Sequence, residues 1–240
     1  MMKPAKTVYK SDLFGRALLD FHKQKACCDL ITWTDISPPE ILRIAYFFRT
    51  YAEMPQHEQA ALSLARGRIL DIGAGAGAHS IWLQNRGADV TALEHSPALS
   101  ELLRLRGIRN VKAADFFSLD KDGPYDTLLL LMNGAGMIGR LERAEAFFRQ
   151  LHKLTHKNAR ILVHLSDIAY LYEAYGHPFP DDRYYGETKF FLKYGPYCTE
   201  PFPWIYFDPD LFGYLAGRYG FRAETILEED TGDFLVRLTK

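Results

Sequence analysis

The sequence predicts an α/β fold built on a doubly wound, mainly parallel sheet of seven strands. Three observations predict it: strand and helix patterns alternate from residue 68 to 166, a glycine-rich turn follows the first of these strands, and two apolar runs near the C-terminus are separated by a short turn. Alternating strands and helices are typical of parallel sheets that helices cover on both faces. The final pair of runs is typical of an antiparallel hairpin.

Composition narrows the class of protein. The 240 residues are enough for a single α/β domain with a large core. With 29 Lys and Arg against 30 Asp and Glu, the net charge of -1 would attract neither nucleic acid nor an anionic membrane. The three cysteines suit a reducing cytoplasm, because they are too few for a disulfide framework and lack the spacing of a zinc site. No apolar stretch reaches the ~20 residues of a membrane helix. We therefore expect a cytoplasmic protein without a metal, a nucleic-acid partner or a membrane anchor.

The first strand, Arg68–Ile72, carries Asp71 near its end and leads into the glycines. Its short apolar run has no helical spacing, as expected for a central parallel strand. Glycine permits positive φ and close approach of the backbone to a ligand, and the amides of the next helix would point at that ligand. The sequence therefore predicts a ligand-binding loop made by Gly73, Ala74, Gly75 and Gly77.

Two further strands end in acidic residues. The second, 88–94, ends at Glu94, about 20 residues after the glycines, which is the spacing at which an acid reaches ribose hydroxyls. The third, 111–115, ends at Asp115 beside the ring of Phe116. An acid and a ring suit an adenine, since the acid accepts from its amino group and the ring packs on its face.

The glycine loop alone does not distinguish between two cofactors. Gly73, Gly75 and Ala78 also satisfy the dinucleotide fingerprint, and Glu94 suits the ribose of either cofactor. Asp71 is a poor neighbour for a pyrophosphate but a good one for a cationic ligand or for loop amides. It therefore favours a sulfonium-bearing amino acid over NAD.

Read in order, these strand ends resemble those of the class I S-adenosylmethionine-dependent methyltransferases, over roughly residues 55 to 240. The resemblance implies a Rossmann-like fold, S-adenosylmethionine as the cofactor and S-adenosylhomocysteine as the product. It implies that Asp71 and the glycine loop hold the methionine part, that Glu94 binds the ribose hydroxyls, and that Asp115 and Phe116 lie by the adenine.

The family's fourth motif follows the strand 124–133 here, so the resemblance places Asn133 at the methyl-transfer end. His79 and His95 flank the expected site, and we include His95 among the cofactor-binding residues. The acids and the amide also have purely structural interpretations. Asp71 and Asp115 could cap turns, Glu94 could lie in a solvated loop, and Asn133 could end a strand.

Caps and apolar spacing place the other elements. Ser96 precedes one helix, and Asp208 with Pro209 begins another that Gly220 ends. The expected helices cover 80–85, 97–105, 141–154 and 209–219, the fifth strand covers 159–166, and the hairpin strands cover 221–227 and 234–238.

Two segments lie outside this common core. Residues 1–54 are expected to form an N-terminal helical cap region, with helices at 11–27 and 39–51 that either cover the cofactor or pack on the sheet. Residues 55–240 are expected to form the methyltransferase domain, including an insertion at about 167–207 that is crowded with aromatic residues. These rings could line an acceptor pocket, with Tyr184, Tyr185 and Trp204 as candidates, or form the core of a small β-lid in which 187–194 pairs with 202–207.

Methyl transfer from a sulfonium needs mainly alignment, and a general base only for an acceptor whose proton has a high pKa. The candidate bases are His164, Asp167 and His177, although His164 could also be a core residue. The fourth motif lacks the Asn-Pro-Pro-Tyr pattern of enzymes that methylate amino groups of nucleic acids or a protein glutamine. A small organic acceptor is therefore the preferred partner, and the oligomeric state stays open.

Two other classes of function stay open. A degenerate methyltransferase fold that binds a nucleoside or a protein would retain every fold feature. An NAD-dependent oxidoreductase would retain the glycine loop and Glu94, but it would leave Asp71, Asp115 and the terminal hairpin unexplained.

Overall fold

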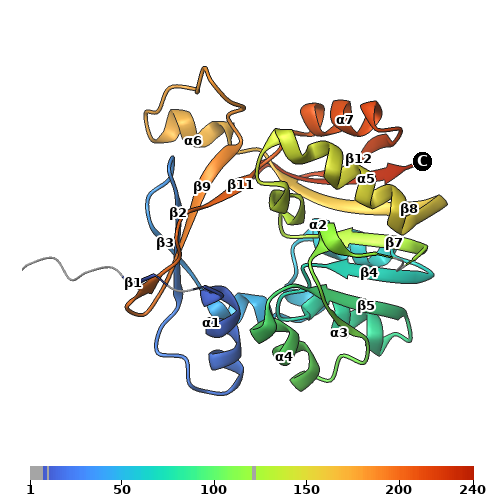
Figure 1. Cartoon of the computed structure of the whole chain (residues 1–240), viewed down its shortest axis with the longest axis horizontal. Helices are drawn as coiled ribbons and strands as arrows, with labels where there is room; N and C mark the ends of the chain where they lie inside the picture. The colour runs from blue at the N-terminus through green and yellow to red at the C-terminus, as the bar shows by residue number, and fades with distance from the viewer. Residues whose placement is uncertain (1–7, 10, 121–122) are drawn as a thin grey trace, which may run out of the picture.

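The computed structural model describes residues 8–9, 11–120 and 123–240 and contains two sheets on opposite sides of the molecule (Figure 1). The larger sheet has seven strands in the order β12-β13-β8-β7-β4-β5-β6. Strands β4 to β8 pair in parallel, whereas β13 is antiparallel to both β8 and β12. The predicted fold class is therefore confirmed. The strands are β4 (Arg68–Ile72), β5 (Asp89–Glu94), β6 (Val111–Ala113), β7 (Tyr125–Leu130), β8 (Thr155–Ser166), β12 (Arg222–Glu228) and β13 (Asp233–Thr239).

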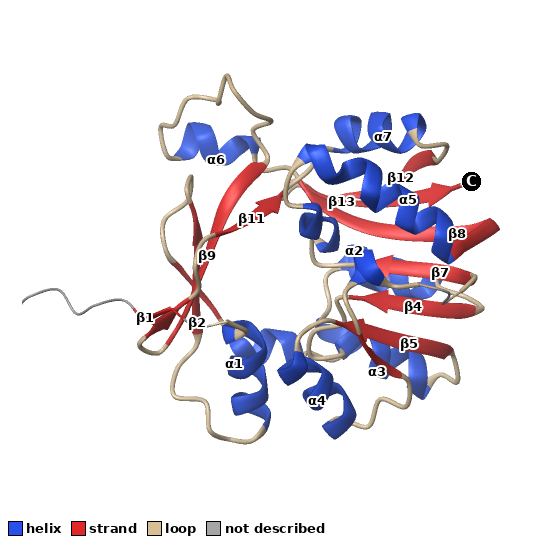
Figure 2. Ribbon diagram, viewed as in Figure 1, coloured by secondary structure: helices blue, strands red, loops and turns tan. Residues whose placement is uncertain are grey.

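Helices cover both faces of this sheet (Figure 2). Successive leucines of β7 alternate between two apolar clusters, as a period of two requires: Leu128 packs with the side of α5 and α7, and Leu129 with the side of α2 and α3. The predicted caps are present, since the Ser96 hydroxyl accepts from Leu99 N at 3.0 Å and Asp208 accepts from Leu211 N at 2.8 Å. The helices are α2 (Gln56–Leu64), α3 (Ala78–Asn85), α4 (Pro97–Leu105), α5 (Ala144–Leu154) and α7 (Pro209–Arg218).

The second sheet joins the N-terminal segment to the aromatic insertion. Its central strand, β9, pairs with β11 as the sequence predicts, and along its other edge it pairs antiparallel with β2. Segments more than 150 residues apart along the chain therefore form one sheet. Its strands are β1 (Val8–Tyr9), β2 (Leu30–Thr34), β3 (Glu40–Leu42), β9 (Glu187–Tyr194), β10 (Tyr197–Cys198) and β11 (Phe202–Ile205).

The prediction of a helix at 39–51 is wrong. Residues Glu40–Leu42 form β3, which pairs with β2, and two short 3-10 helices follow at Ile44–Phe48 (η1) and Tyr51–Glu53 (η2). Ile41 of β3 is 72% exposed. Helix propensity is a weak preference that tertiary context overrides, and here the free edge of β2 supplies a partner for this segment.

The helix expected at 11–27 is present as α1 (Leu13–His22), and it packs beside α4. Leu13 and Leu18 of α1 share an apolar cluster with Ala76 of the glycine loop and Leu192 of β9. The N-terminal segment therefore covers the glycine loop as well as joining the second sheet. Within the described part of the chain, no helix has the length and apolar character needed to cross a membrane.

Candidate functional site

The glycine loop after β4 is open on the side where a ligand would lie. Gly73 and Gly75 have φ of +70° and +58°, and a Cβ at Gly73 would have no neighbour within 4 Å. At Gly75 the nearest atom would be the Gly73 carbonyl oxygen at 3.9 Å. Gly77 is glycine for another reason, because a Cβ there would overlap the side chain of Ile108. Ala74 is buried, and its amide donates to Leu93 O at 3.1 Å.

Glu94 ends β5 with its carboxylate directed at this loop. The side chain is 4% exposed; Oε2 accepts from Gly75 N at 3.1 Å and Oε1 accepts from Ser96 N at 3.0 Å. His95 Nδ1 lies 3.3 Å from Oε1, and this hydrogen bond raises the pKa of His95. Glu94 is therefore a buried, ordered carboxylate rather than a solvated loop acid.

Asp71 lies inside the protein at the end of β4. It is 2% exposed and accepts from Ser80 Oγ of α3 at 2.6 Å. Burial raises the pKa of Asp71, although nearby His79 and the Ser80 hydrogen bond act in the opposite direction. The carboxylate thus fixes α3 to the strand and sets the geometry of the loop between them.

The third strand end differs from its expected form. β6 stops at Ala113, and Asp115 instead caps a 3-10 turn, η3 (Phe116–Ser118), accepting from Phe117 N at 2.8 Å. The Phe116 ring is 4% exposed and packs against Phe147, with ring centroids 5.5 Å apart. The adenine contact expected from the Phe116 ring is therefore wrong, because the core already covers that ring. The role of Asp115 stays a prediction.

A buried ion cluster beside the loop was not predicted. Arg49 Nη2 lies 2.5 and 2.6 Å from the two carboxylate oxygens of Glu58 on α2, and His79 Nε2 of α3 lies 2.9 Å from Glu58 Oε2. The Arg49 and Glu58 side chains are 4% and 1% exposed. Arg49 Nε has no hydrogen-bond partner among the described residues, and Nη2 lies 3.3 Å from Met132 Sδ. The only signal in the sequence was His79, directly after the glycines.

The Glu58 carboxylate should make stability depend on pH. Burial alone would raise its pKa, but His79 and Arg49 outweigh burial and lower the pKa of Glu58 from 4.5 to about 2. A carboxylate whose folded pKa lies below its unfolded pKa contributes stability above the unfolded value, and this stability is lost as pH falls through the folded value. We expect the free energy of unfolding to fall by about 3 kcal/mol between pH 5 and 2 from this group. Urea titrations across that range should show a shallower loss in Glu58→Gln, and an equal loss in both proteins would contradict the assignment.

Asn133 follows β7 and is held from two sides. Its φ is +57°, its amide N donates to His164 Nδ1 at 3.0 Å, and its Nδ2 donates to Ser166 Oγ at 2.7 Å. His164 Nε2 lies 3.0 Å from Asp233 Oδ1. Burial would raise the pKa of Asp233, but hydrogen bonds from His164, Ser166 and Thr231 outweigh burial and lower it.

These contacts contradict His164 as a general base. Nδ1 accepts from Asn133, so Nε2 carries the proton and donates to Asp233. No ring nitrogen is left for a substrate, and the side chain is 5% exposed. His164 is therefore a positioning residue for the Asn133 turn. His177 is exposed in the loop after α6 (Ala169–Ala174), and its role as a base stays a prediction.

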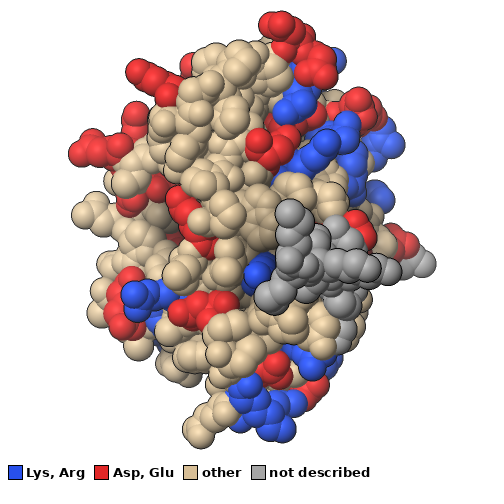
Figure 3. Space-filling model, turned by 90° about the vertical axis from the view of Figure 1, so that its left-hand side faces the viewer, with Lys and Arg blue, Asp and Glu red and all other residues tan. Residues whose placement is uncertain are grey.

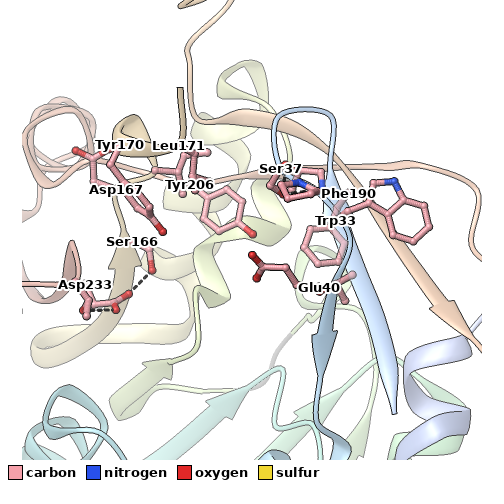
Figure 4. Close-up of a pocket in the computed structure, with 15 residues that line it drawn as sticks. Trp33, Ser37, Glu40, Ser166, Asp167, Tyr170, Leu171, Phe190, Tyr206 and Asp233 are labelled. Atoms are coloured by element: carbon pink, nitrogen blue, oxygen red, sulfur yellow. Dashed lines mark hydrogen bonds between the residues drawn. The ribbon is translucent and has the colours of Figure 1, made fainter. Parts of the chain in front are cut away.

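A cavity of about 340 Å³ lies between the β2–β3 hairpin, the insertion, the carboxyl end of β8 and the amino end of β13 (Figure 4). The third candidate base, Asp167, belongs to its wall, and Asp167 Oδ1 accepts from Tyr185 Oη at 2.7 Å and Ala169 N at 2.9 Å. The rings that line the cavity are those of Tyr170, Phe190 and Tyr206. Trp33 also belongs to the wall, but its ring stacks on Phe191 on the other face of the second sheet, with ring centroids 5.1 Å apart.

None of the three rings predicted to bind substrate belongs to this wall. Tyr184 donates to Asp208 Oδ2 at 2.6 Å and packs with the core, and Trp204 packs against Gly136. Tyr185 contacts the cavity wall through its hydrogen bond to Asp167. Some rings of the insertion therefore pack in its own core, and others face a cavity.

The strand order places the loop and the cavity at one edge. Strand β4 lies between β5 and β7, and the chain order reverses there, which is where doubly wound sheets bind ligands. The glycine loop follows β4, Asn133 follows β7, and the cavity begins at Ser166 of β8. Asn133 thus lies between a loop suited to a cofactor and a cavity suited to a second ligand.

The outer surface carries both signs of charge. Figure 3 shows that most of the face beside the second sheet is uncharged, with Asp and Glu in several groups and Lys and Arg in others. This mixture agrees with the net charge of -1.

Comparisons with known proteins agree with this geometry. The methyltransferase domain family matches residues 31–225. The crystal structure of a SAM-dependent methyltransferase from Bacteroides fragilis, in complex with S-adenosyl-L-homocysteine, is 36% identical, with a TM-score of 0.85 over 95% of this chain and 94% of that chain. An uncharacterised methyltransferase from Staphylococcus carnosus is 26% identical over 158 residues, which are 66% of this chain and 72% of that protein.

More distant structures share the fold alone. A SAM-bound amino pentose methyltransferase from Micromonospora echinaspora is 18% identical, with a TM-score of 0.55 over 79% of this chain and 89% of that chain. The match over 31–225 spans most of the sequence, and the Bacteroides fragilis protein is similar over nearly its whole length. This chain therefore belongs to the class I S-adenosylmethionine-dependent methyltransferases.

Proposed function

We propose that this protein transfers the methyl group of S-adenosylmethionine to a small organic acceptor bound in the cavity beside β8. The observation that carries the proposal is the placement of the open glycine loop and the cavity on either side of Asn133. A volume of about 340 Å³ suits a small molecule. The related Bacteroides fragilis protein binds S-adenosyl-L-homocysteine, the product expected here.

The residues at the loop fit the proposed cofactor. Gly73 and Gly75 leave open space where a ligand would approach the backbone, and the buried carboxylate of Glu94 lies against the same loop. Glu94 would accept from ribose hydroxyls, whereas Asp71 would act through the loop and α3 that it holds. When bound, S-adenosylmethionine supplies a sulfonium-activated methyl group.

The chain's own contribution to transfer is alignment and exclusion of water. His164 fixes the Asn133 turn between the two ligands, and the second sheet covers the outer side of the cavity. Alignment in a closed site can lower a barrier by about 7–11 kcal/mol. Asp167 is the base candidate that lines the cavity, and we propose that it accepts a proton when the acceptor must lose one.

The decisive experiment is a calorimetric titration with S-adenosylmethionine, S-adenosylhomocysteine and NAD in parallel. We expect micromolar binding of both sulfur ligands and none of NAD. Turnover is then followed as release of S-adenosylhomocysteine over a panel of small acceptors. Binding of NAD alone would favour an oxidoreductase, and cofactor binding without turnover of any acceptor would favour a binding module.

The cavity wall gives a separate prediction about the acceptor. Tyr206→Ala is expected to lower kcat/KM at least tenfold, because it removes a ring worth roughly 1.5–3 kcal/mol of apolar contact. Affinity for S-adenosylmethionine should stay unchanged. Tyr175→Ala is the matched control, since Tyr175 is an exposed ring of the same insertion outside the wall. An equal loss of cofactor affinity in Tyr206→Ala would place that ring on the cofactor side.

A further inference from the structure

The charged side chains in the described part of the cavity wall are all acidic. The wall contains three carboxylates, Glu40, Asp167 and Asp233, and among the described residues no Lys, Arg or His lines it. Asp233 is fully engaged by His164, Ser166 and Thr231. The other two carboxylates are therefore the ones available to a ligand.

Both of these carboxylates keep free acceptor atoms. The carboxylate of Glu40 in β3 makes no hydrogen bond or ion pair with any residue in 8–9, 11–120 or 123–240, and Figure 4 shows it projecting across the cavity toward Ser166. The two bonds to Asp167 both reach Oδ1, so Oδ2 is left without a protein donor in the described structure. A carboxylate only accepts hydrogen bonds, and a ligand that satisfies it must donate.

The ring walls favour the same kind of ligand. Aromatic faces attract a cation within about 6 Å through the ring quadrupole. The hydroxyl of Tyr206, a half-buried residue, also has no hydrogen-bond partner in the described residues, and in Figure 4 it points toward the space near Glu40. Burial raises the pKa of Tyr170, and the negative charges of Asp233 and Glu40 raise it further. The field in the cavity is thus negative, and an anionic acceptor would be repelled.

We infer that the methyl acceptor is a small molecule carrying a positively charged amine, which Glu40 and Asp167 hold between the ring faces of this cavity. The inference rests on the proposed function and narrows its acceptor class. Glu40 lies at the exposed rim, so it selects for charge as the acceptor enters, while Asp167 lies deeper at the end of β8. Neutral alcohols of the same shape could donate to Glu40 but would not neutralise its charge, and carboxylates would face like charge.

The test compares three probes of matched shape: 2-phenylethylamine, 2-phenylethanol and phenylacetate. Their binding to the protein saturated with S-adenosylhomocysteine is measured by ligand-observed NMR titration. We expect the amine to bind about tenfold more tightly than the alcohol and phenylacetate to bind most weakly, on the scale of one charge-assisted hydrogen bond. Glu40→Gln should remove most of the preference for the amine and leave alcohol binding unchanged. Glu173→Gln is the control, because Glu173 is an exposed acid on α6 outside the wall. This substitution should change neither the preference for the amine nor the binding of the alcohol.

Equal affinity for the amine and the alcohol, or an unchanged preference in Glu40→Gln, would overturn the inference. Release of S-adenosylhomocysteine from separate amine and alcohol panels separates this failure from failure of the proposed function. Turnover of alcohols alone would retain the methyltransferase function and refute the amine. Tight amine binding with no turnover of either panel would instead contradict the proposed function, and the assignment of an acceptor with it.

Discussion

Arg49→Met is expected to lower the free energy of unfolding by about 3–5 kcal/mol, which is the cost of leaving one partner of a buried ion pair uncompensated. Arg49 and Glu58 are nearly inaccessible to solvent, and Arg49 Nη2 contacts both carboxylate oxygens. After the substitution, Glu58 keeps the hydrogen bond with His79 Nε2 at 2.9 Å but loses its guanidinium partner. Urea denaturation at pH 7 followed by circular dichroism measures the difference.

The matched control is Arg149→Met. Arg149 pairs with Glu145 one turn earlier on α5, but their side chains are 69% and 57% exposed. Solvent-exposed pairs of this spacing contribute about 0.3–0.5 kcal/mol. A loss in Arg49→Met no larger than in this control would show that the buried cluster contributes little to stability. Because the cluster contains His79 directly after the glycine loop, we also expect Arg49→Met to weaken cofactor binding.

Glu94→Ala is expected to weaken binding of S-adenosylmethionine about tenfold or more, the cost of one lost hydrogen bond to a charged group. The substitution removes the proposed acceptor of the ribose hydroxyls and also the acceptor that Gly75 N and Ser96 N now use. The loop and the ligand contact are thus lost together. Calorimetric titration with S-adenosylmethionine gives the ratio of dissociation constants.

Glu101→Ala is the control for Glu94→Ala, because Glu101 is an exposed acid of the neighbouring helix α4 that pairs with Lys23 at the surface. Its affinity for S-adenosylmethionine should equal that of the wild type. Asp71→Ala should also lower the affinity for S-adenosylmethionine tenfold or more. The effect would come through the loop and α3 rather than through ligand contact, because the Asp71 carboxylate accepts a hydrogen bond from Ser80. Unchanged affinity in both Glu94→Ala and Asp71→Ala would refute the cofactor site.

Local chemistry made much of this structure predictable. The caps at Ser96 and Asp208 satisfy backbone amides within three residues, so their helices begin where the sequence indicates. The glycine loop follows one parallel strand and Glu94 ends the next. The carboxyl ends of parallel strands share one edge of the sheet. The loop and its acids could therefore be assigned before the fold was known.

The predictions that failed depended on partners distant in the chain. Residues 39–51 appeared helical by spacing, but β3 is a strand because β2 offers it an edge. Phe116 appeared free for a ligand, but Phe147 packs against it. His164 appeared to be a candidate base, but Asn133 and Asp233 engage both its nitrogens.

The sequence by itself determined the parallel sheet, the glycine loop and the family, because these depend on periodicity, backbone freedom and the order of strand ends. Only the tertiary structure decided which rings and acids face the cavity beside β8. Glu40 and Asp167 lie more than 120 residues apart along the chain, and they share one wall because β2 pairs with β9 of the insertion. Pairing between distant strands depends on free edges and shared burial, which no local pattern of residues encodes.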